Sequence, residues 1–187
     1  MVKTLRDLDH RYEDIMVQTK STSMVAGVLL RSVHYALGHA ISKDIYDDEL
    51  KSNSRCLIII KMRSGLCFGL GIADGIESKG CVTHIHFASD SYDKSMISDY
   101  DKIIIVDGVI NTGKSILKET DGIDKEKIII ATNVMSDQSI DFLKSYKVFT
   151  TRISDKHYTG SHVTTINDGF GPDTSDRLFK SDFFNNH

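Results

Sequence analysis

Short apolar runs alternate along the chain with segments whose apolar residues recur every three or four positions. The runs Cys56–Met62 and Ile103–Asp107 are rich in isoleucine, which is typical of strands buried on both faces of a parallel sheet. The intervening segments have the helical period, so helical crossovers join the strands. The pattern predicts strands at about 56–62, 82–88, 103–107, 127–134 and 147–152, and helices near 66–77, 114–120 and 137–145.

This order of elements favours an α/β fold with an open, mainly parallel five-stranded sheet and helices on both faces. Residues 1–22 are polar and mixed, and Ser23 is expected to start a long amphipathic helix that runs to about Ile41. Pro172 is the single proline, so no proline-rich linker divides the chain. We therefore expect one domain over residues 1–187.

Composition and charge exclude some classes of function. The net charge of −3 gives no steering toward nucleic acid or an anionic membrane surface, so neither is expected as a partner. No apolar run approaches the length of a membrane span, and the first ten residues lack the apolar core of a signal peptide. Cys56, Cys67 and Cys81 are odd in number and lie in or beside apolar segments. Buried free thiols in a reducing cytoplasm are the expectation.

The most informative segment is the run from Lys102 to Ser115, in which an apolar strand ends at Asp107 and a loop of small residues opens a helix. Unpaired backbone N–H groups at residues 111–115 would face an anion at the helix N-terminus. Thr112 and Ser115 add hydroxyl donors, and the cation Lys114 opposes the helix dipole unless an anion binds there. The segment therefore predicts a phosphate-binding loop.

Two motifs fit this loop. Gly108–Ser115 reads G-x-x-x-x-G-K-S, the P-loop pattern of nucleoside triphosphatases. The strand, acid, small residues and Thr-Gly also resemble the 5-phosphoribosyl-diphosphate (PRPP) loop of type I phosphoribosyltransferases. A P-loop needs a downstream strand that ends in a metal-holding Asp, and the nearest candidate, Asp155, follows a largely polar segment. The PRPP loop is therefore favoured, and the P-loop nucleoside triphosphatase stays as an alternative.

Two further segments resemble uracil phosphoribosyltransferases. The turn Arg63–Leu66 after the first predicted strand is similar to their Arg-Ala-Gly-Leu pyrophosphate loop. Residues 166–179 resemble their Pro-Gly-Leu-Gly-Asp-Ala-Gly-Asp-Arg-Ile-Phe segment, and their PRPP loop also has a single leading acid, as at Asp107. Thr22-Ser23 matches their Thr-Ser helix entry more weakly. Together these motifs span nearly the whole chain in the family's order.

The chain also departs from that family. Asp168 stands where the family has proline, Pro172 looks like an insertion, and Lys114 replaces a glycine of the phosphate loop. The segment 88–100 is shorter than the family's flap and lacks its arginine, for which Lys94 is a candidate substitute. A PRPP-binding regulator or a catalytically weak relative is therefore a further alternative.

The resemblance implies Mg²⁺-dependent transfer of a phosphoribosyl group from PRPP to a pyrimidine base, most closely uracil, giving UMP and pyrophosphate. It implies a small hood formed by the N- and C-terminal segments, a homodimer or higher homo-oligomer, and Mg²⁺ held mainly by substrate oxygens and water rather than by a protein ligand set. The implied catalytic residues are Asp107 and Arg63. The implied PRPP-binding residues are Arg63, Ser64, Gly65, Asp107, Gly108, Val109, Ile110, Asn111, Thr112, Gly113, Lys114, Ser115 and Asp173, and the implied base-binding residues are Ile166, Gly171, Asp173 and Thr174.

Overall fold

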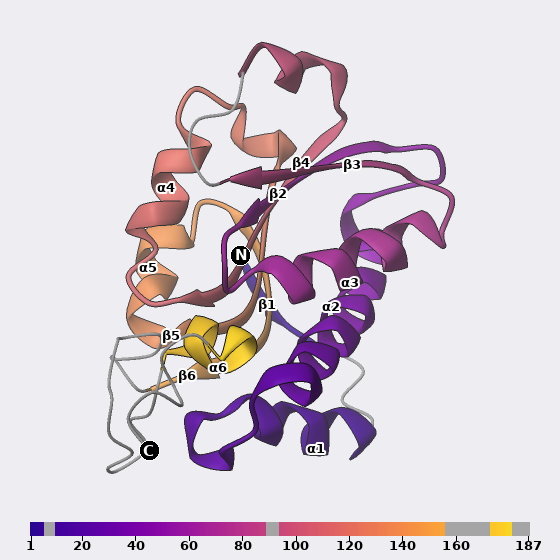
Figure 1. Cartoon of the computed structure of the whole chain (residues 1–187). Helices are drawn as coiled ribbons and strands as arrows, with labels where there is room; N and C mark the ends of the chain where they lie inside the picture. Colours follow the sequence, from indigo (N-terminus) through magenta and orange to yellow (C-terminus); the bar gives the residue numbers. More distant parts are fainter. Residues whose placement is uncertain (6–9, 89–93, 156–172, 181–187) are drawn as a thin grey trace.

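The protein is described by a computed structural model that covers residues 1–5, 10–88, 94–155 and 173–180. Its strands form one sheet in the order β1-β6-β5-β4-β2-β3, and every neighbouring pair is parallel. The open α/β fold predicted from the sequence is confirmed, with six strands instead of five (Figure 1). The strands are β1 (Val2–Thr4), β2 (Arg55–Lys61), β3 (Val82–Ala88), β4 (Lys102–Ile110), β5 (Ile128–Ser136) and β6 (Lys147–Ser154).

Helices cover both faces of this sheet, as predicted. On one face, Leu37, Ile41 and Phe68 of the two long helices pack on Ile58 and Ile104 of the central strands. On the other face, the short helices contribute the buried Ile116 and Leu143 to a second apolar cluster. The helices are α1 (His10–Thr19), α2 (Gly27–Glu49), α3 (Leu66–Glu77), α4 (Lys114–Thr120), α5 (Ile140–Leu143) and α6 (Thr174–Phe179).

The start of the long helix was predicted wrongly. Helix α2 begins at Gly27 and continues to Glu49, and Ser23 belongs to a preceding 3₁₀ helix, Ser21–Ser23. The Ser23 hydroxyl donates to the carbonyl oxygens of Gln18 and Lys20, so it closes a turn and does not cap α2. Met24 then adopts a left-handed backbone conformation with φ 58°.

Smaller differences affect other elements. The predicted strand at residues 127–134 continues to Ser136, and the one at residues 147–152 continues to Ser154. The predicted helix at residues 137–145 is divided into a 3₁₀ helix, Asp137–Ser139, and α5. Further 3₁₀ helices lie at Lys94–Asp99 and Lys125–Lys127. None of the helices in the described ranges combines the length and the apolar character that a bilayer crossing requires.

The N-terminal and C-terminal segments meet at Arg177 of α6, whose side chain is almost completely buried. Its guanidinium donates to the carbonyl oxygens of Gln18, Thr19 and Val25 and to the Ser23 hydroxyl, over 2.7–3.3 Å. Hydrogen bonds to a charged donor are stronger than neutral ones, so these contacts fix α6 against the segment that precedes α2.

A buried polar cluster lies between α2 and the sheet. His34 Nε2 lies 3.5 Å from Asn133 Nδ2, and Asn133 Oδ1 accepts a hydrogen bond of 2.7 Å from Thr151. Burial lowers the pKa of His34 from 6.5 to about 3, and the positive charges of Arg177 and Arg152 act in the same direction. His34 is therefore neutral in the folded protein at physiological pH.

Candidate active site

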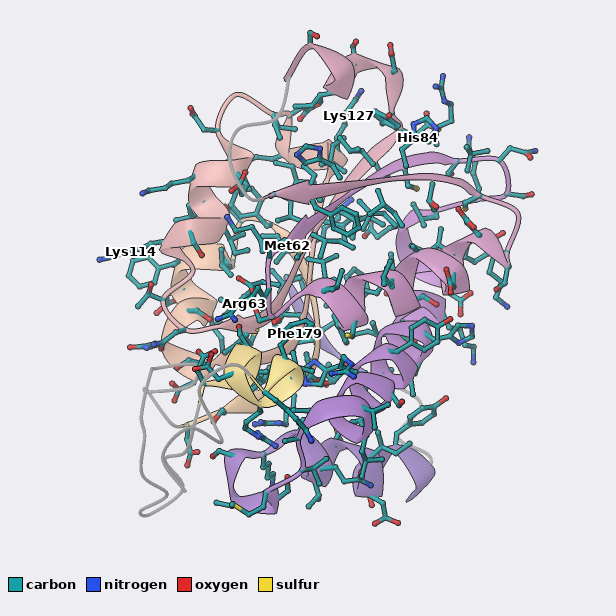
Figure 2. The ribbon with its side chains drawn as sticks, in the orientation of Figure 1. Met62, Arg63, His84, Lys114, Lys127 and Phe179 are labelled. Atoms are coloured by element: carbon teal, nitrogen blue, oxygen red, sulfur yellow. The ribbon has the colours of Figure 1, made fainter. Side chains whose placement is uncertain are left out.

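The candidate site lies at the carboxyl edge of the sheet, where β2 and β4 end side by side. The turn from Met62 to Gly65 follows β2, and the Met62–Arg63 peptide bond in it is cis. Figure 2 shows Arg63 beside helix α6, while Lys114 extends outward from α4. Parallel strands bring such loops to one edge, which is where ligands bind in open α/β sheets.

The turn after β2 contacts the acid of β4 directly. Ser64 donates its hydroxyl hydrogen to Asp107 Oδ1 over 2.5 Å, and the backbone N–H of Val109 lies 3.4 Å from the same oxygen. Burial raises the pKa of Asp107 from 3.8 to about 6, although the bonds from Ser64 and Val109 act in the opposite direction. Asp107 therefore remains mostly ionised at neutral pH, in an environment that penalises its charge.

Two glycines allow this close approach. A Cβ atom at Gly65 would lie 2.8 Å from the carbonyl oxygens of Lys61 and Val106. A Cβ atom at Gly108 would collide with the carbonyl group of Ser64. Any side chain at either position would therefore separate the turn from β4.

The predicted phosphate loop begins later than expected, because β4 continues through Ile110. Val109 and Ile110 pair with Val134 and Met135 of β5, so Gly108, Val109 and Ile110 are strand residues and not loop residues. Both side chains are β-branched, and that of Ile110 is buried, which favours extending the strand.

The remaining loop, residues 111–113, leads into α4. Gly113 has φ 76°, a left-handed conformation that favours glycine, and it precedes the first helical residue, Lys114. The Asn111 side chain accepts a hydrogen bond of 2.6 Å from Gln138. Thr112, Lys114 and Ser115 are exposed at this helix entrance, as a loop that receives an anion from solvent requires.

The C-terminal segment is described only in part. Ile166 and Gly171 lie outside the described residues. Asp173 caps α6, because its carboxylate accepts a hydrogen bond of 2.7 Å from the Ser175 backbone N–H. Thr174 is the first residue of that helix. The structure therefore gives Asp173 a local capping contact, and its role toward PRPP and a base stays a prediction.

Sequence reasoning missed the ion pair between Arg63 and Asp176. Arg63 Nη2 lies 3.3 Å from Asp176 Oδ1, which brings α6 to the turn after β2. Lys61, just before the turn, pairs with Glu119 of α4 over 2.5 Å. No local pattern in the sequence announces either contact, because each joins residues far apart along the chain.

The fold and this site define a class: a doubly covered parallel α/β protein with a desolvated acid, a basic turn and a phosphate-loop candidate at one sheet edge. No protein-family profile and no curated protein sequence matches the chain. Among solved structures, the AQ2163 protein from Aquifex aeolicus is similar, with a TM-score of 0.65, 15% sequence identity and coverage of 97% of this chain and 99% of that chain.

Two other solved structures are similar at lower scores. The TT1426 protein from Thermus thermophilus has a TM-score of 0.49 and 11% identity over 66% of this chain and 84% of its own. The HGPRT-ase from Leishmania tarentolae, in complex with GMP, has a TM-score of 0.43 and 13% identity over 74% of this chain and 77% of its own. At 15% identity the similarity to AQ2163 establishes the fold alone.

Proposed function

We propose that the protein transfers the phosphoribosyl group of PRPP to a nucleobase and releases pyrophosphate. The observation that carries this proposal is the contact between Ser64 and Asp107, because it joins a basic turn and a strand-end acid. A ribosyl centre flanked by a diphosphate needs a cationic group for the leaving group and a carboxylate beside the sugar. The phosphate-loop candidate follows the same strand, so all three parts come from adjacent segments.

In this proposal the reacting carbon is C1 of the ribose. The base nitrogen forms the new bond to C1 while the bond from C1 to the pyrophosphate oxygen breaks. The pyrophosphate oxygen keeps the electron pair of the broken bond, and the proton of the base N–H passes to water. Arg63 and the backbone of Ser64 and Gly65 would bind the pyrophosphate, and residues 111–115 the 5′-phosphate. Asp107 would accept hydrogen bonds from the ribose hydroxyls and favour the positive charge that develops on the sugar.

Mg²⁺ is part of this proposal, and the donor set of the site is compatible with it. In the described part of the chain, no group of three or more His, Cys, Asp or Glu side chains is arranged to enclose a metal ion. Asp107 offers one carboxylate at the site, and Mg²⁺ commonly binds through one or two carboxylates while keeping waters and substrate phosphates. When bound with the substrate, the ion would neutralise charge on the diphosphate.

We further propose uracil as the base. Support comes only from the sequence of residues 166–179, in which Ile166, Gly171, Asp173 and Thr174 are the candidate base contacts. The decisive experiment is an assay of pyrophosphate release from PRPP and Mg²⁺ across a panel of pyrimidine and purine bases. Release with uracil, and none without a base, is expected. Release with purines alone would reject the choice of base and keep the reaction class.

Two alternatives have distinct outcomes. The shortness of segment 88–100, without an arginine, favours a PRPP-binding regulator, which would bind PRPP and release no pyrophosphate with any base. A P-loop nucleoside triphosphatase would be stabilised by Mg²⁺-ATP. For one site at 100 times its dissociation constant, the free energy of unfolding rises by about 2.7 kcal/mol. A thermal-shift titration in which ATP stabilises the protein and PRPP does not would reject the phosphoribosyltransferase proposal.

A further inference from the structure

Asp176 and Arg63 form an asymmetric pair. The side chain of Asp176 is 5% exposed and that of Arg63 is 50% exposed, and one terminal nitrogen of the guanidinium makes the 3.3 Å contact. The carboxylate is therefore held inside the protein, while half of the arginine surface remains accessible to solvent.

The position of Asp176 is itself fixed. It lies in the first turn of α6, which Asp173 caps through the Ser175 N–H. The next residue, Arg177, is bound to the segment before α2, and Arg31 of α2 donates a bond of 2.7 Å to the Leu178 carbonyl oxygen. These contacts on both sides of Asp176 make its carboxylate a rigid reference point for a long, flexible side chain.

The turn that carries Arg63 is anchored a second time. Lys61 precedes it and pairs with Glu119, whose helix α4 follows the phosphate-loop candidate. Both partners of that pair are largely buried. The turn therefore lies between two carboxylates from different helices, and Asp176 is the one that pairs with its arginine.

We infer that Asp176 is a positioning residue that holds the Arg63 guanidinium in the orientation needed to bind a diphosphate. The inference rests on the proposed function, since it assigns Arg63 the pyrophosphate group of PRPP. A guanidinium binds phosphate oxygens through a planar fork, so its affinity depends on orientation more than that of an ammonium group does. Fixing the fork before the ligand arrives removes part of the entropy that binding would otherwise lose.

The test is a double-mutant cycle on the affinity for inorganic pyrophosphate, measured by calorimetry with Mg²⁺ present. Asp176→Asn is expected to lower the affinity for pyrophosphate about tenfold, which is the effect of losing one hydrogen bond to a charged group. In an Arg63→Ala background the same change is expected to have no further effect. Asp176→Glu, which keeps the charge, should restore part of the affinity.

Glu119→Gln is the matched control, because it breaks the other ion pair of the turn without touching Arg63. Its effect on affinity should add to that of Arg63→Ala. Circular dichroism and urea unfolding of each variant identify any change that comes from loss of folding. Steady-state kinetics with PRPP and uracil should show a raised KM for PRPP in Asp176→Asn.

Three results would overturn the inference: an additive cycle between Arg63 and Asp176, tighter pyrophosphate binding by Asp176→Asn, or no pyrophosphate binding by the unmodified protein. Tighter binding would mean that the carboxylate competes with the anion. The proposed function fails separately. A protein that binds pyrophosphate with a coupled Arg63–Asp176 pair and transfers no phosphoribosyl group keeps the inference and loses the reaction.

Discussion

Gly108 and Ser64 are in such close contact that residue 108 can carry no side chain while Ser64 keeps its position. The carbonyl group of Ser64 occupies the space of a Cβ atom at residue 108. The obstacle is backbone, which has less freedom to move than a side chain. The same contact aligns the Ser64 hydroxyl with Asp107.

Gly108→Ala is therefore expected to displace the turn after β2 and to lower the affinity for PRPP by at least tenfold. Overpacking of this kind typically destabilises a protein by about 1–3 kcal/mol. Gly69→Ala is the control, because its Cβ would meet the buried side chain of Ile60 and not the backbone of Ser64. Calorimetric titration with PRPP and urea unfolding of both variants check this. Equal losses of affinity would mean that the site does not depend on the contact.

Asp107→Asn is expected to abolish most turnover while making the fold more stable at neutral pH. The pKa of Asp107 is raised to about 6 from 3.8, so the folded protein binds more protons than the unfolded chain between these values. The carboxyl contributes most to stability below pH 3.8, and that contribution is lost as the pH rises through 6. At pH 7.5 the amide should raise the free energy of unfolding by up to about 3 kcal/mol. This estimate follows from the shift of the Asp107 pKa from 3.8 to about 6, because one pKa unit corresponds to about 1.36 kcal/mol.

Urea unfolding of wild type and Asp107→Asn at pH 5 and 7.5 checks this sign. The difference in stability should be larger at pH 7.5 than at pH 5. Single-turnover rates with PRPP and uracil measure the loss of catalysis on the same samples. A variant that unfolds more easily and turns over normally would make Asp107 a structural residue.

His34 is expected to make the fold acid-sensitive. Its pKa falls from 6.5 to about 3 on folding, so the stability that depends on neutral His34 is present above pH 6.5 and is lost as the pH falls toward 3. Between pH 6.5 and 5 the free energy of unfolding falls by about 2 kcal/mol because of His34. His34→Gln should be less stable than wild type at pH 7.5 but should lose less on acidification. His39→Gln, on the exposed side of the same helix, is the control for replacing a histidine of α2.

Lys114 distinguishes the two phosphate-loop motifs. If the loop binds a monoester 5′-phosphate, Lys114→Gly removes one charge contact and weakens the binding of PRPP by about 1–2 kcal/mol. Turnover at saturating PRPP should then stay near normal. A P-loop lysine would act on the transferring phosphoryl group, and its loss would abolish turnover. Lys118→Gly, which removes an exposed lysine from the same helix, controls for the destabilising effect of placing a glycine in α4. Loss of turnover at unchanged PRPP affinity would contradict the assignment.

Strand β3 is expected to mediate self-association. It is the last strand of the sheet order, and Val82, Ile85 and Phe87 are exposed large apolar residues along it. An exposed apolar edge strand favours pairing with another chain. Phe87→Lys should lower the average mass seen in light scattering at micromolar concentration. A monomeric wild type would reject the expectation.

Strands β2, β4 and β5 were predictable because each is an apolar run in which isoleucine is the main component. Strands β3 and β6 were recognised by their β-branched and aromatic residues. Strand β1 was missed because its three residues, Val2–Thr4, carry no apolar pattern of their own and form a strand only beside β6. The entry of α2 was placed at Ser23 because serine often caps helices, whereas this hydroxyl bonds backward.

The candidate site, too, could be predicted only in part from the sequence. Asp107 and the turn at Arg63 follow directly from the strand ends, since parallel strands bring their carboxyl ends to one edge. The extension of β4 through Val109 and Ile110 depends on pairing with β5, which local sequence does not encode. The Arg63–Asp176 pair joins residues 113 positions apart and could not be inferred from spacing.

The contacts of Arg177 have a consequence for the order in which the molecule folds. They join residues separated by 152–159 positions, while β4 and β5 pair across a short connection that contains α4 and the 3₁₀ helix Lys125–Lys127. Closing such a long loop is entropically expensive, and it becomes favourable only once the intervening sheet holds both ends near each other. Pairing of the central strands β2, β4 and β5 should therefore precede the docking of α6, so that the Arg63–Asp176 ion pair forms only late in folding.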